Sequence, residues 1–414
     1  MKGIPRRAAV GLVLALTACS DGPSGPNGST PDPDFDAGEV LVRLAPSADL
    51  AAFNARHGTR TIASVTSERV HLLGLPAGSD VVGILPALRA DPALVAAAPN
   101  GVLGTPETEA EGRSTMAFAD PSLTGSDYSD QNALDRMRVP EAWEASRGAG
   151  VVVAVLDTGV DPTHPLLAGR LATGGVDVID GDTDPSEVAD GVDSDGDGLT
   201  DEAMGHGTFV AGLVLSVAPE ARVLPIRVLD SDGVGTAFQV AVGLEAARRA
   251  GARVVNLSLG MTEEADVVEQ VIDEMEDEGV VFIASAGNRA SDRRQFPAGA
   301  GDVIGVAAID EDDRRAEFSN FGSWVSASAP GVGLVSLLPT GALGTWSGTS
   351  FAAALASGEA ALLIALAPGA RADDIRDAIL DSALRLPDPS LNGAGRLDAR
   401  AAVEWLLDRV GDDS

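Results

Sequence analysis

The chain of 414 residues contains only one cysteine, Cys19, so no disulfide bond can form within it. Basic side chains are also scarce: 29 lysines and arginines stand against 62 aspartates and glutamates, a formal net charge of −33. A surface with this charge repels the phosphates of nucleic acids and anionic lipids, which argues against both as binding partners. Among the four histidines, His57, His71 and His164 show no metal-ligand spacing, and a structural role is expected for His164.

The N-terminal residues predict export. A basic start, Met1–Arg7, precedes the apolar run Ala8–Leu16 and the small residues before Cys19, which is the pattern of a signal peptide over residues 1–18. The run is too short to span a bilayer as a mature helix. Leu16-Thr17-Ala18-Cys19 resembles the bacterial lipobox, in which the cysteine becomes the acylated N-terminus. A plain signal peptide that happens to contain a cysteine is the alternative.

Residues 19–36, rich in Ser, Gly, Pro and Asp, predict a flexible tether between this signal and a small domain over residues 37–104. The domain shows strand, helix, strand, strand, helix and strand patterns in turn. Asp49 and Gly58 mark the ends of its first helix, and Pro86 is expected to kink the second. This βαββαβ order predicts a ferredoxin-like α+β fold. The polar, glycine-containing residues 105–124 predict a linker and the expected maturation region.

Residues 125–410 predict a larger α/β domain with a mostly parallel sheet and helices on both faces. Apolar strands alternate with amphipathic helices along it. The strands are expected at residues 151–156, 222–227, 253–257, 280–284 and 303–308, and the helices at 236–250, 266–278 and 351–366. The last of these helices is apolar, but it contains Ser357, Gly358 and Glu359, and its length is that of a buried core helix.

Three polar residues in this domain have the setting of a nucleophile, a base and an orienting carboxylate. Asp157 ends a buried strand, where α/β sheets place their active sites. His206 lies between two glycines at the start of a helix, and Ser350 lies at a helix N-terminus, whose free N–H groups can hold an oxyanion. A serine nucleophile needs a base, and that base needs a carboxylate to fix its tautomer. Taken singly, each residue also fits a capping, turn or core role.

The segments around these residues together resemble those of the subtilases, the subtilisin-like serine proteases, over roughly residues 128–407. The resemblance implies an Asp157–His206–Ser350 triad and an oxyanion hole formed by Asn288 and the Ser350 N–H. It also implies that peptide substrates lie along two segments, Ser258-Leu259-Gly260 and Ala286-Gly287. The small domain then resembles the family's propeptide, although an accessory domain that stays attached is the alternative. One departure is Ala354-Leu355, where the family usually has Pro-His.

An acidic loop before His206 predicts a structural calcium site. Asp193, Asp195 and Asp197 have the Asp-x-Asp-x-Asp-Gly spacing of a calcium loop, with the Leu199 carbonyl and Asp201 as further ligands. The twelfth position is Met204, so the loop is not an EF-hand. A solvated acidic loop without a bound ion is the alternative.

The sequence thus predicts a lipid-anchored, self-processed serine endopeptidase of a bacterial envelope. Its expected partners are protein or peptide substrates, its own propeptide and the membrane that holds the lipid on Cys19; no organic cofactor is expected, and the protein is expected to be a monomer. The alternative function is a catalytically inactive member of the same fold that acts as a calcium-stabilised surface binding protein.

Overall fold

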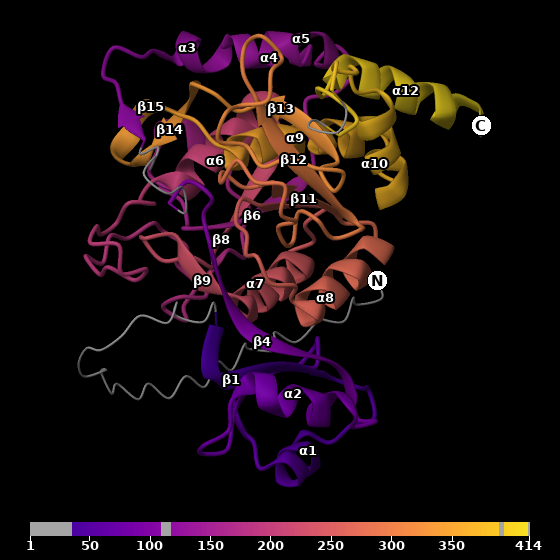
Figure 1. Cartoon of the computed structure of the whole chain (residues 1–414). Helices are drawn as coiled ribbons and strands as arrows, with labels where there is room; N and C mark the ends of the chain where they lie inside the picture. The colour runs from indigo at the N-terminus through magenta and orange to yellow at the C-terminus, as the bar shows by residue number, and fades with distance from the viewer. Residues whose placement is uncertain (1–34, 109–116, 389–392, 413–414) are drawn as a thin grey trace, which may run out of the picture.

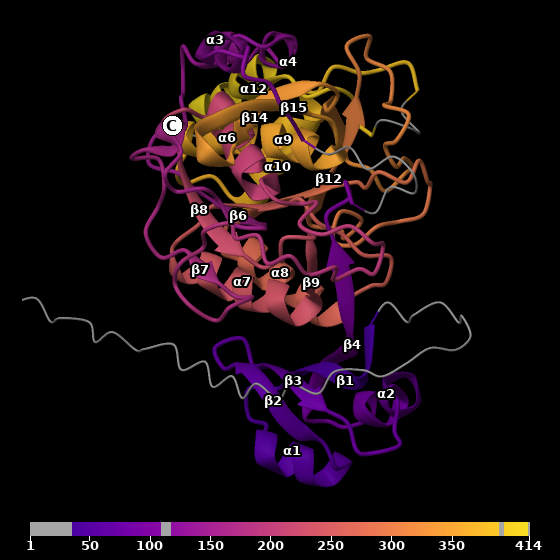
Figure 2. The same cartoon turned by 90° about the vertical axis from the view of Figure 1, so that its left-hand side faces the viewer.

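A computed structural model describes residues 35–108, 117–388 and 393–412, and the predicted signal peptide, Cys19 and nearly all of the tether lie outside them. The described chain forms a small N-terminal unit below a larger unit (Figure 1). Strand β4 (Leu94–Gly104) runs from the small unit up to the large one, where it lies beside β9 (Val234–Thr236) (Figure 2).

The small unit has the predicted βαββαβ order. After β1 (Phe35–Leu44) come α1 (Leu50–His57), β2 (Arg60–Val65), β3 (Val70–Gly74), α2 (Val81–Arg89) and β4. The strands form an antiparallel sheet in the order β2-β3-β1-β4. Asp49 caps α1, and Gly58 ends it in the left-handed conformation, as expected. Helix α2 includes Pro86 and is assigned as one helix across it.

The large unit is built on seven parallel strands in the order β13-β12-β11-β10-β6-β8-β7. Their bounds are β6 (Val152–Asp157), β7 (Val176–Asp177), β8 (Arg222–Arg227), β10 (Val254–Leu257), β11 (Val281–Ser285), β12 (Val303–Ile309) and β13 (Ala327–Pro330). Nearly every residue of these strands is buried, because helices cover both faces, and β-branched or small apolar side chains suit such strands. The predicted fold class is therefore confirmed.

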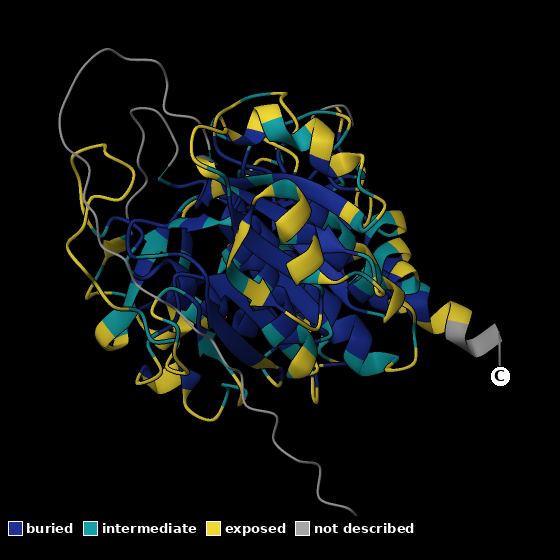
Figure 3. Cartoon of the chain, turned by 90° about the horizontal axis from the view of Figure 1, so that it is seen from below, coloured by how far each residue is buried: buried dark blue, intermediate teal, exposed yellow. Residues whose placement is uncertain are grey.

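Two long apolar helices, α6 (His206–Val217) and α9 (Thr349–Leu366), pack on one face of the sheet, together with α10 (Ala372–Asp381) and α12 (Ala399–Asp412). Helices α7 (Ala237–Arg249) and α8 (Asp266–Asp277) cover the other face. Seen from below, exposed residues lie on the outer helices and loops around a buried interior (Figure 3). Helix α9 has the length and hydropathy of a membrane span, but 89% of it is buried within the fold. The sequence interpretation of α9 as a core helix agrees with this packing.

The remaining elements lie around this core. A second small sheet contains β5 (Phe118–Ala119), β14 (Leu334–Leu338) and β15 (Ala342–Trp346). Short helices are α3 (Gly125–Ser129), α4 (Asn132–Arg136), α5 (Val139–Ala142) and the 3-10 turns η1 (Pro165–Leu167) and η2 (Pro339–Gly341).

The small unit packs on the large one through the sheet face opposite α1 and α2. Apolar residues of β1, β3 and β4 join the same core cluster as α7 and α8. Ion pairs surround this contact: Arg43 binds Glu274, Arg248 binds Glu68 at 2.5 Å, and Arg89 lies 3.3 Å from Asp266. The two units are thus held together by both apolar packing and charge.

The structure changes one expectation about the join between the units. Thr105 and Glu107 belong to the predicted polar linker, yet they are 0% and 1% exposed. They are buried because β4 continues to Gly104 and carries the following residues into the large unit. The linker therefore begins inside the protein rather than on its surface.

Candidate active site

Asp157 and His206 are brought together by the ends of two elements. Asp157 is the last residue of β6, and His206 is the first residue of α6. The His206 Nδ1 atom lies 2.7 Å from the Asp157 Oδ1 atom, and both side chains are fully buried. The Thr158 N–H donates to the same Asp157 oxygen at 2.8 Å. The carboxylate is thus held in place to fix one tautomer of the imidazole.

Ser350 is the second residue of α9 and lies in the first turn, where the backbone N–H groups have no partner within the helix. Its carbonyl accepts a hydrogen bond from the Ser258 hydroxyl at 3.0 Å. His206 lies beside Phe351 and Trp346, with ring centroids 5.5 Å away in both cases. The histidine and the serine are therefore packed into the same part of the core.

Asn288 follows β11 and points its amide toward the same place. Its Oδ1 atom accepts hydrogen bonds from the Thr349 N–H at 3.0 Å and the Thr349 hydroxyl at 2.9 Å. These two donors fix the amide orientation and leave its Nδ2 group to donate to another acceptor. The Gly287 N–H donates to the Thr349 hydroxyl at 3.0 Å and completes this support.

A fourth side chain, which the sequence interpretation missed, joins these groups. The Glu107 carboxylate accepts from the Ser350 hydroxyl at 2.7 Å and from the Asn288 Nδ2 group at 3.0 Å, and it lies 3.0 Å from His206 Nε2. A side chain at Gly348 would place its Cβ 1.8 Å from the Glu107 Oε1 atom, so glycine leaves room for the carboxylate in this arrangement. The two oxygens of this carboxylate divide the contacts: Oε2 contacts Ser350 and His206, and Oε1 accepts from Asn288.

The electrostatics of His206 follow from this arrangement. Burial disfavours the charged imidazolium, but the Asp157 and Glu107 carboxylates outweigh burial and raise the pKa of His206 to about 10. In this state the histidine is protonated at neutral pH and cannot accept a proton from Ser350. The arrangement is closed to catalysis while Glu107 remains.

The chain that carries Glu107 is held between two strands. On one side, Val102, Leu103 and Gly104 pair antiparallel with β9, and the Thr105 N–H donates to the Gly233 carbonyl at 3.0 Å. On the other side, Gly104 and Gly260 exchange two backbone hydrogen bonds of 3.0 and 2.9 Å. A bond from the Thr108 N–H to the Thr105 carbonyl then closes a turn. The turn brings the Glu107 side chain to Ser350.

The two predicted substrate-binding segments, Ser258-Leu259-Gly260 and Ala286-Gly287, lie on either side of one buried amide, that of Gln295. A Cβ atom at Gly260 would lie 2.5 Å from the Gln295 Nε2 atom, and one at Gly287 would lie 2.2 Å from its Oε1 atom. Gln295 is 3% exposed, and its Oε1 accepts from the Asn320 amide at 3.0 Å. The glutamine therefore sets the spacing of the two segments.

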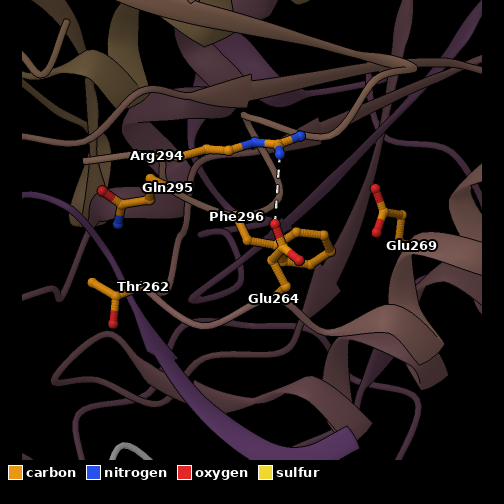
Figure 4. A pocket seen from close by; sticks show the side chains of 6 residues that line it. All are labelled: Thr262, Glu264, Glu269, Arg294, Gln295 and Phe296. Atoms are coloured by element: carbon orange, nitrogen blue, oxygen red, sulfur yellow. Dashed lines mark hydrogen bonds and ion pairs between the residues drawn. The ribbon is translucent and has the colours of Figure 1, made fainter. Parts of the chain in front are cut away.

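A small pocket lies beside this glutamine rather than over the serine. Thr262, Glu264, Glu269, Arg294, Gln295 and Phe296 line it, and Arg294 reaches across to Glu264 (Figure 4). The Met261 and Phe296 backbones exchange two hydrogen bonds of 2.9 Å beneath it. None of the residues named for the triad or the oxyanion hole lines this pocket.

In the acidic loop, only part of the predicted calcium ligand set is brought together. One carboxylate oxygen each from Asp193, Asp195 and Asp197 lies within 4.8 Å of the others. Asp201 lies outside this group, and its Oδ1 atom accepts the N–H groups of Asp190 and Gly191. Its role as a ligand stays a prediction. Leu199, whose carbonyl was the other predicted ligand, lies in the same exposed turn.

Glu202, next to this loop, was not predicted as part of it. The residue is 5% exposed, and neither carboxylate oxygen has a hydrogen-bond partner among the described residues. Burial, together with the charges of Asp197 and Asp195, raises its pKa to about 7. A divalent cation nearby would compensate this buried carboxylate, so the local chemistry fits a calcium ion.

The described geometry supports acyl transfer. It provides a hydroxyl nucleophile, an imidazole with an oriented carboxylate, and two donors, the Asn288 amide and the helix N-terminus, around the position of an anionic oxygen. The Glu107 Oε1 atom accepts from one of these donors, the Asn288 amide, at 3.0 Å.

Comparisons with known proteins agree with this chemistry. Residues 148–401 match the Subtilase family, and residues 22–100 match the fervidolysin N-terminal prodomain. Thermitase from Thermoactinomyces vulgaris is 35% identical over 297 residues, which cover 69% of this chain and 99% of thermitase. Subtilisin BL from Lederbergia lenta is 34% identical over 280 residues, 65% of this chain and 97% of that protein.

A solved structure resembles nearly the whole chain. It is fervidolysin from Fervidobacterium pennivorans, described as a keratinolytic enzyme related to subtilisin, with a TM-score of 0.73. The match covers 91% of this chain and 62% of fervidolysin at 24% identity. At this identity the likeness concerns the fold, including a prodomain in front of the larger unit.

Proposed function

We propose that Ser350 is the nucleophile of peptide hydrolysis. The premise is that the chain belongs to the subtilase family of serine endopeptidases. In this reaction Ser350 attacks the scissile carbonyl, and His206 takes the hydroxyl proton and passes it to the leaving amine. Asp157 holds the imidazole and stabilises its charged form. Asn288 and the Ser350 N–H stabilise the oxyanion.

The observation that carries this proposal is the shared Glu107 carboxylate. Its Oε1 atom accepts from the Asn288 amide, as an oxyanion would, and its Oε2 atom contacts the Ser350 hydroxyl and His206 Nε2, which places all three residues around one point. Labelling with a fluorophosphonate probe after maturation tests the function. Wild-type protein should be labelled and Ser350→Ala should not, whereas absence of labelling in both would favour the inactive surface binding protein.

We also propose that the chain is a precursor that cuts itself after the prodomain. Support comes from β4, which pairs with β9 and Gly260 on its two sides as an extended peptide substrate would. Because Glu107 fills the place of the oxyanion, no bond can be cut in the arrangement described. We expect the first cut within residues 105–124, once Glu107 has left that place.

Calcium is proposed as a structural ion of the acidic loop. Asp193, Asp195, Asp197 and the Leu199 carbonyl would supply ligand oxygens, and the ion would compensate Glu202. The loop leads directly to His206, so binding would order the chain that positions the base. The ion carries no step of the hydrolysis.

Export and lipid anchoring through Cys19 are proposed from the sequence pattern alone. Mass spectrometry of the membrane fraction tests them: wild-type protein should carry a diacylglyceryl group on Cys19, and Cys19→Ser should lack it. A Cys19→Ser protein that loses its signal and still partitions into the membrane like the wild type would contradict the anchor.

A further inference from the structure

The loop that leads to the calcium-loop residues carries a second glutamate, Glu187, which contacts the chain beside the triad. Its backbone lies against the residues that follow Asp157: the Val160 N–H donates to the Pro185 carbonyl, and the Glu187 N–H donates to the Val160 carbonyl, both at 3.0 Å. Gly159 makes this approach possible, because a Cβ atom there would lie 2.6 Å from the Pro185 carbonyl oxygen. The loop is therefore fixed to the end of β6.

The Glu187 carboxylate connects the strand end to the start of α6. Its Oε1 atom accepts from the Thr158 hydroxyl at 2.5 Å and from the Gly207 N–H at 3.1 Å. Its Oε2 atom accepts a short hydrogen bond from the Thr208 hydroxyl. Thr158 follows Asp157 directly, and Gly207 and Thr208 follow His206. One side chain thus joins the neighbours of two triad residues.

We propose that Glu187 is a positioning residue for the triad, which fixes the Asp157-bearing strand end against the His206-bearing helix start and adds negative charge near the imidazole. It touches no reacting atom. Asp157 is the direct partner of His206, and Glu187 acts on the same histidine through the backbone and through its charge. The inference rests on the proposed serine-protease function.

The charges around Glu187 define what its removal should do. Asp157 at the end of β6 and His206 at the start of α6 are the charged groups that act on Glu187. Asp161 lies nearby, and its backbone N–H donates to the Thr208 hydroxyl. Burial, against the hydrogen bonds of the two threonines, raises the pKa of Glu187 to about 7, with Asp157 acting in the same direction and His206 opposing it. Glu187 is charged above about pH 7, and its attraction to the imidazolium is mutual, so loss of this charge should lower the His206 pKa of about 10 in the precursor.

The test compares Glu187→Gln with Glu187→Asp in the matured enzyme. In Glu187→Gln, kcat should fall about tenfold, as expected when hydrogen bonds to a charged group are lost, while KM stays within about twofold. Glu187→Asp retains a carboxylate on a shorter side chain and should restore part of the lost kcat.

A matched control makes the same chemical change elsewhere. Glu311 is exposed on the loop after β12, and Glu311→Gln should leave kcat and KM unchanged. A kcat in Glu187→Gln within about twofold of the wild-type value would overturn the proposal, whatever the melting temperature of the variant. Such a result would leave Glu187 as a residue of the fold only.

A second measurement does not need activity or maturation. Histidine titration by NMR in a Ser350→Ala precursor, with and without Glu187→Gln, follows His206 directly among the four histidines. The pKa of His206 should be lower with Glu187→Gln, and equal values would again overturn the proposal. If wild-type protein did not react with a fluorophosphonate probe, the proposed hydrolysis would fail, but this titration would still report on Glu187.

Discussion

Two glutamates lie near His206, and they come from two different regions of the chain. Glu107 comes from the segment after the prodomain, contacts the reacting atoms themselves and leaves His206 protonated. Glu187 comes from a loop of the large unit and contacts only the neighbours of Asp157 and His206. The difference teaches that the atoms a carboxylate touches, rather than its charge alone, decide whether it blocks a catalytic site or supports it.

The largest effect should come from removing the Ser350 hydroxyl, which donates to Glu107. Ser350→Ala should lower the rate of peptide hydrolysis by about 10⁴–10⁶-fold, since the nucleophile is lost. It should also stop self-maturation of the precursor, which gel electrophoresis and mass spectrometry of purified protein would follow. Cleavage between Pro99 and Tyr128 in this variant, with no other protease present, would show that the cut is not made by Ser350.

The next effect concerns the donor that both Glu107 and an oxyanion would share. Asn288→Ala should reduce kcat by about 10²–10³-fold, because the amide stabilises charge that develops only in the transition state. KM should change little. Steady-state kinetics on a chromogenic peptide would measure both values, and a variant that changes KM alone would remove Asn288 from the oxyanion hole.

Replacing the Glu107 carboxylate should raise the rate of maturation, whereas the two changes above lower a rate. In the precursor, Glu107→Gln should speed maturation by about tenfold at neutral pH, because a charged hydrogen-bond partner of the site is lost. The pair of Glu107 and His206 is fully formed below the ordinary histidine pKa of 6.5 and is lost as pH rises through about 10. Wild-type maturation should therefore accelerate toward pH 10, and Glu107→Gln should reach the same rate at lower pH.

The control for this variant uses a precursor that cannot cut itself. Ser350→Ala, with and without Glu107→Gln, is digested by added mature enzyme. Equal digestion of the two would mean that Glu107→Gln matures faster because its active site is no longer blocked. Faster digestion of the glutamine form would mean that the linker had only become a better substrate.

The smallest effect on the chemistry should come from the acidic loop. Calcium should raise the melting temperature and restore activity after chelation. At a hundredfold excess over its dissociation constant, it should raise the free energy of unfolding by about 2.7 kcal/mol. Asp195→Ala with Asp197→Ala should remove most of that response in a thermal melt. Asp201→Asn should retain it, because the Asp201 carboxylate accepts backbone N–H groups instead of facing the other three. An unchanged response in the double variant would place the site elsewhere.

Local pattern was enough to predict most of the fold. The strand predicted at residues 222–227 has those bounds in the structure, and Asp49 and Gly58 end α1 as predicted. Such elements depend on neighbours in sequence and on burial, both visible in a single chain. The continuation of β4 to Gly104 was not predicted, because its pairing with β9 depends on docking of the two units.

The candidate site was only partly predictable for the same reason. Family motifs mark Asp157, His206, Asn288 and Ser350, but nothing near Glu107 in the sequence indicates a contact with Ser350, 243 residues away. Glu187 and Gln295 also act through contacts that only the folded chain brings together. Glu107 is one of several acids in the predicted linker, so its residue type gave no signal that set it apart.

Strand β4 has a consequence for how the enzyme would be set free. In the uncut chain its hydrogen bonds to β9 and Gly260 form within one molecule, at an effective concentration that for short linkers is of millimolar order. After a cut beyond Gly104, the same bonds have to hold two separate molecules together at their actual concentration. Dilution would then control release, and a prodomain fixed to a membrane would stay behind while the large unit diffused away.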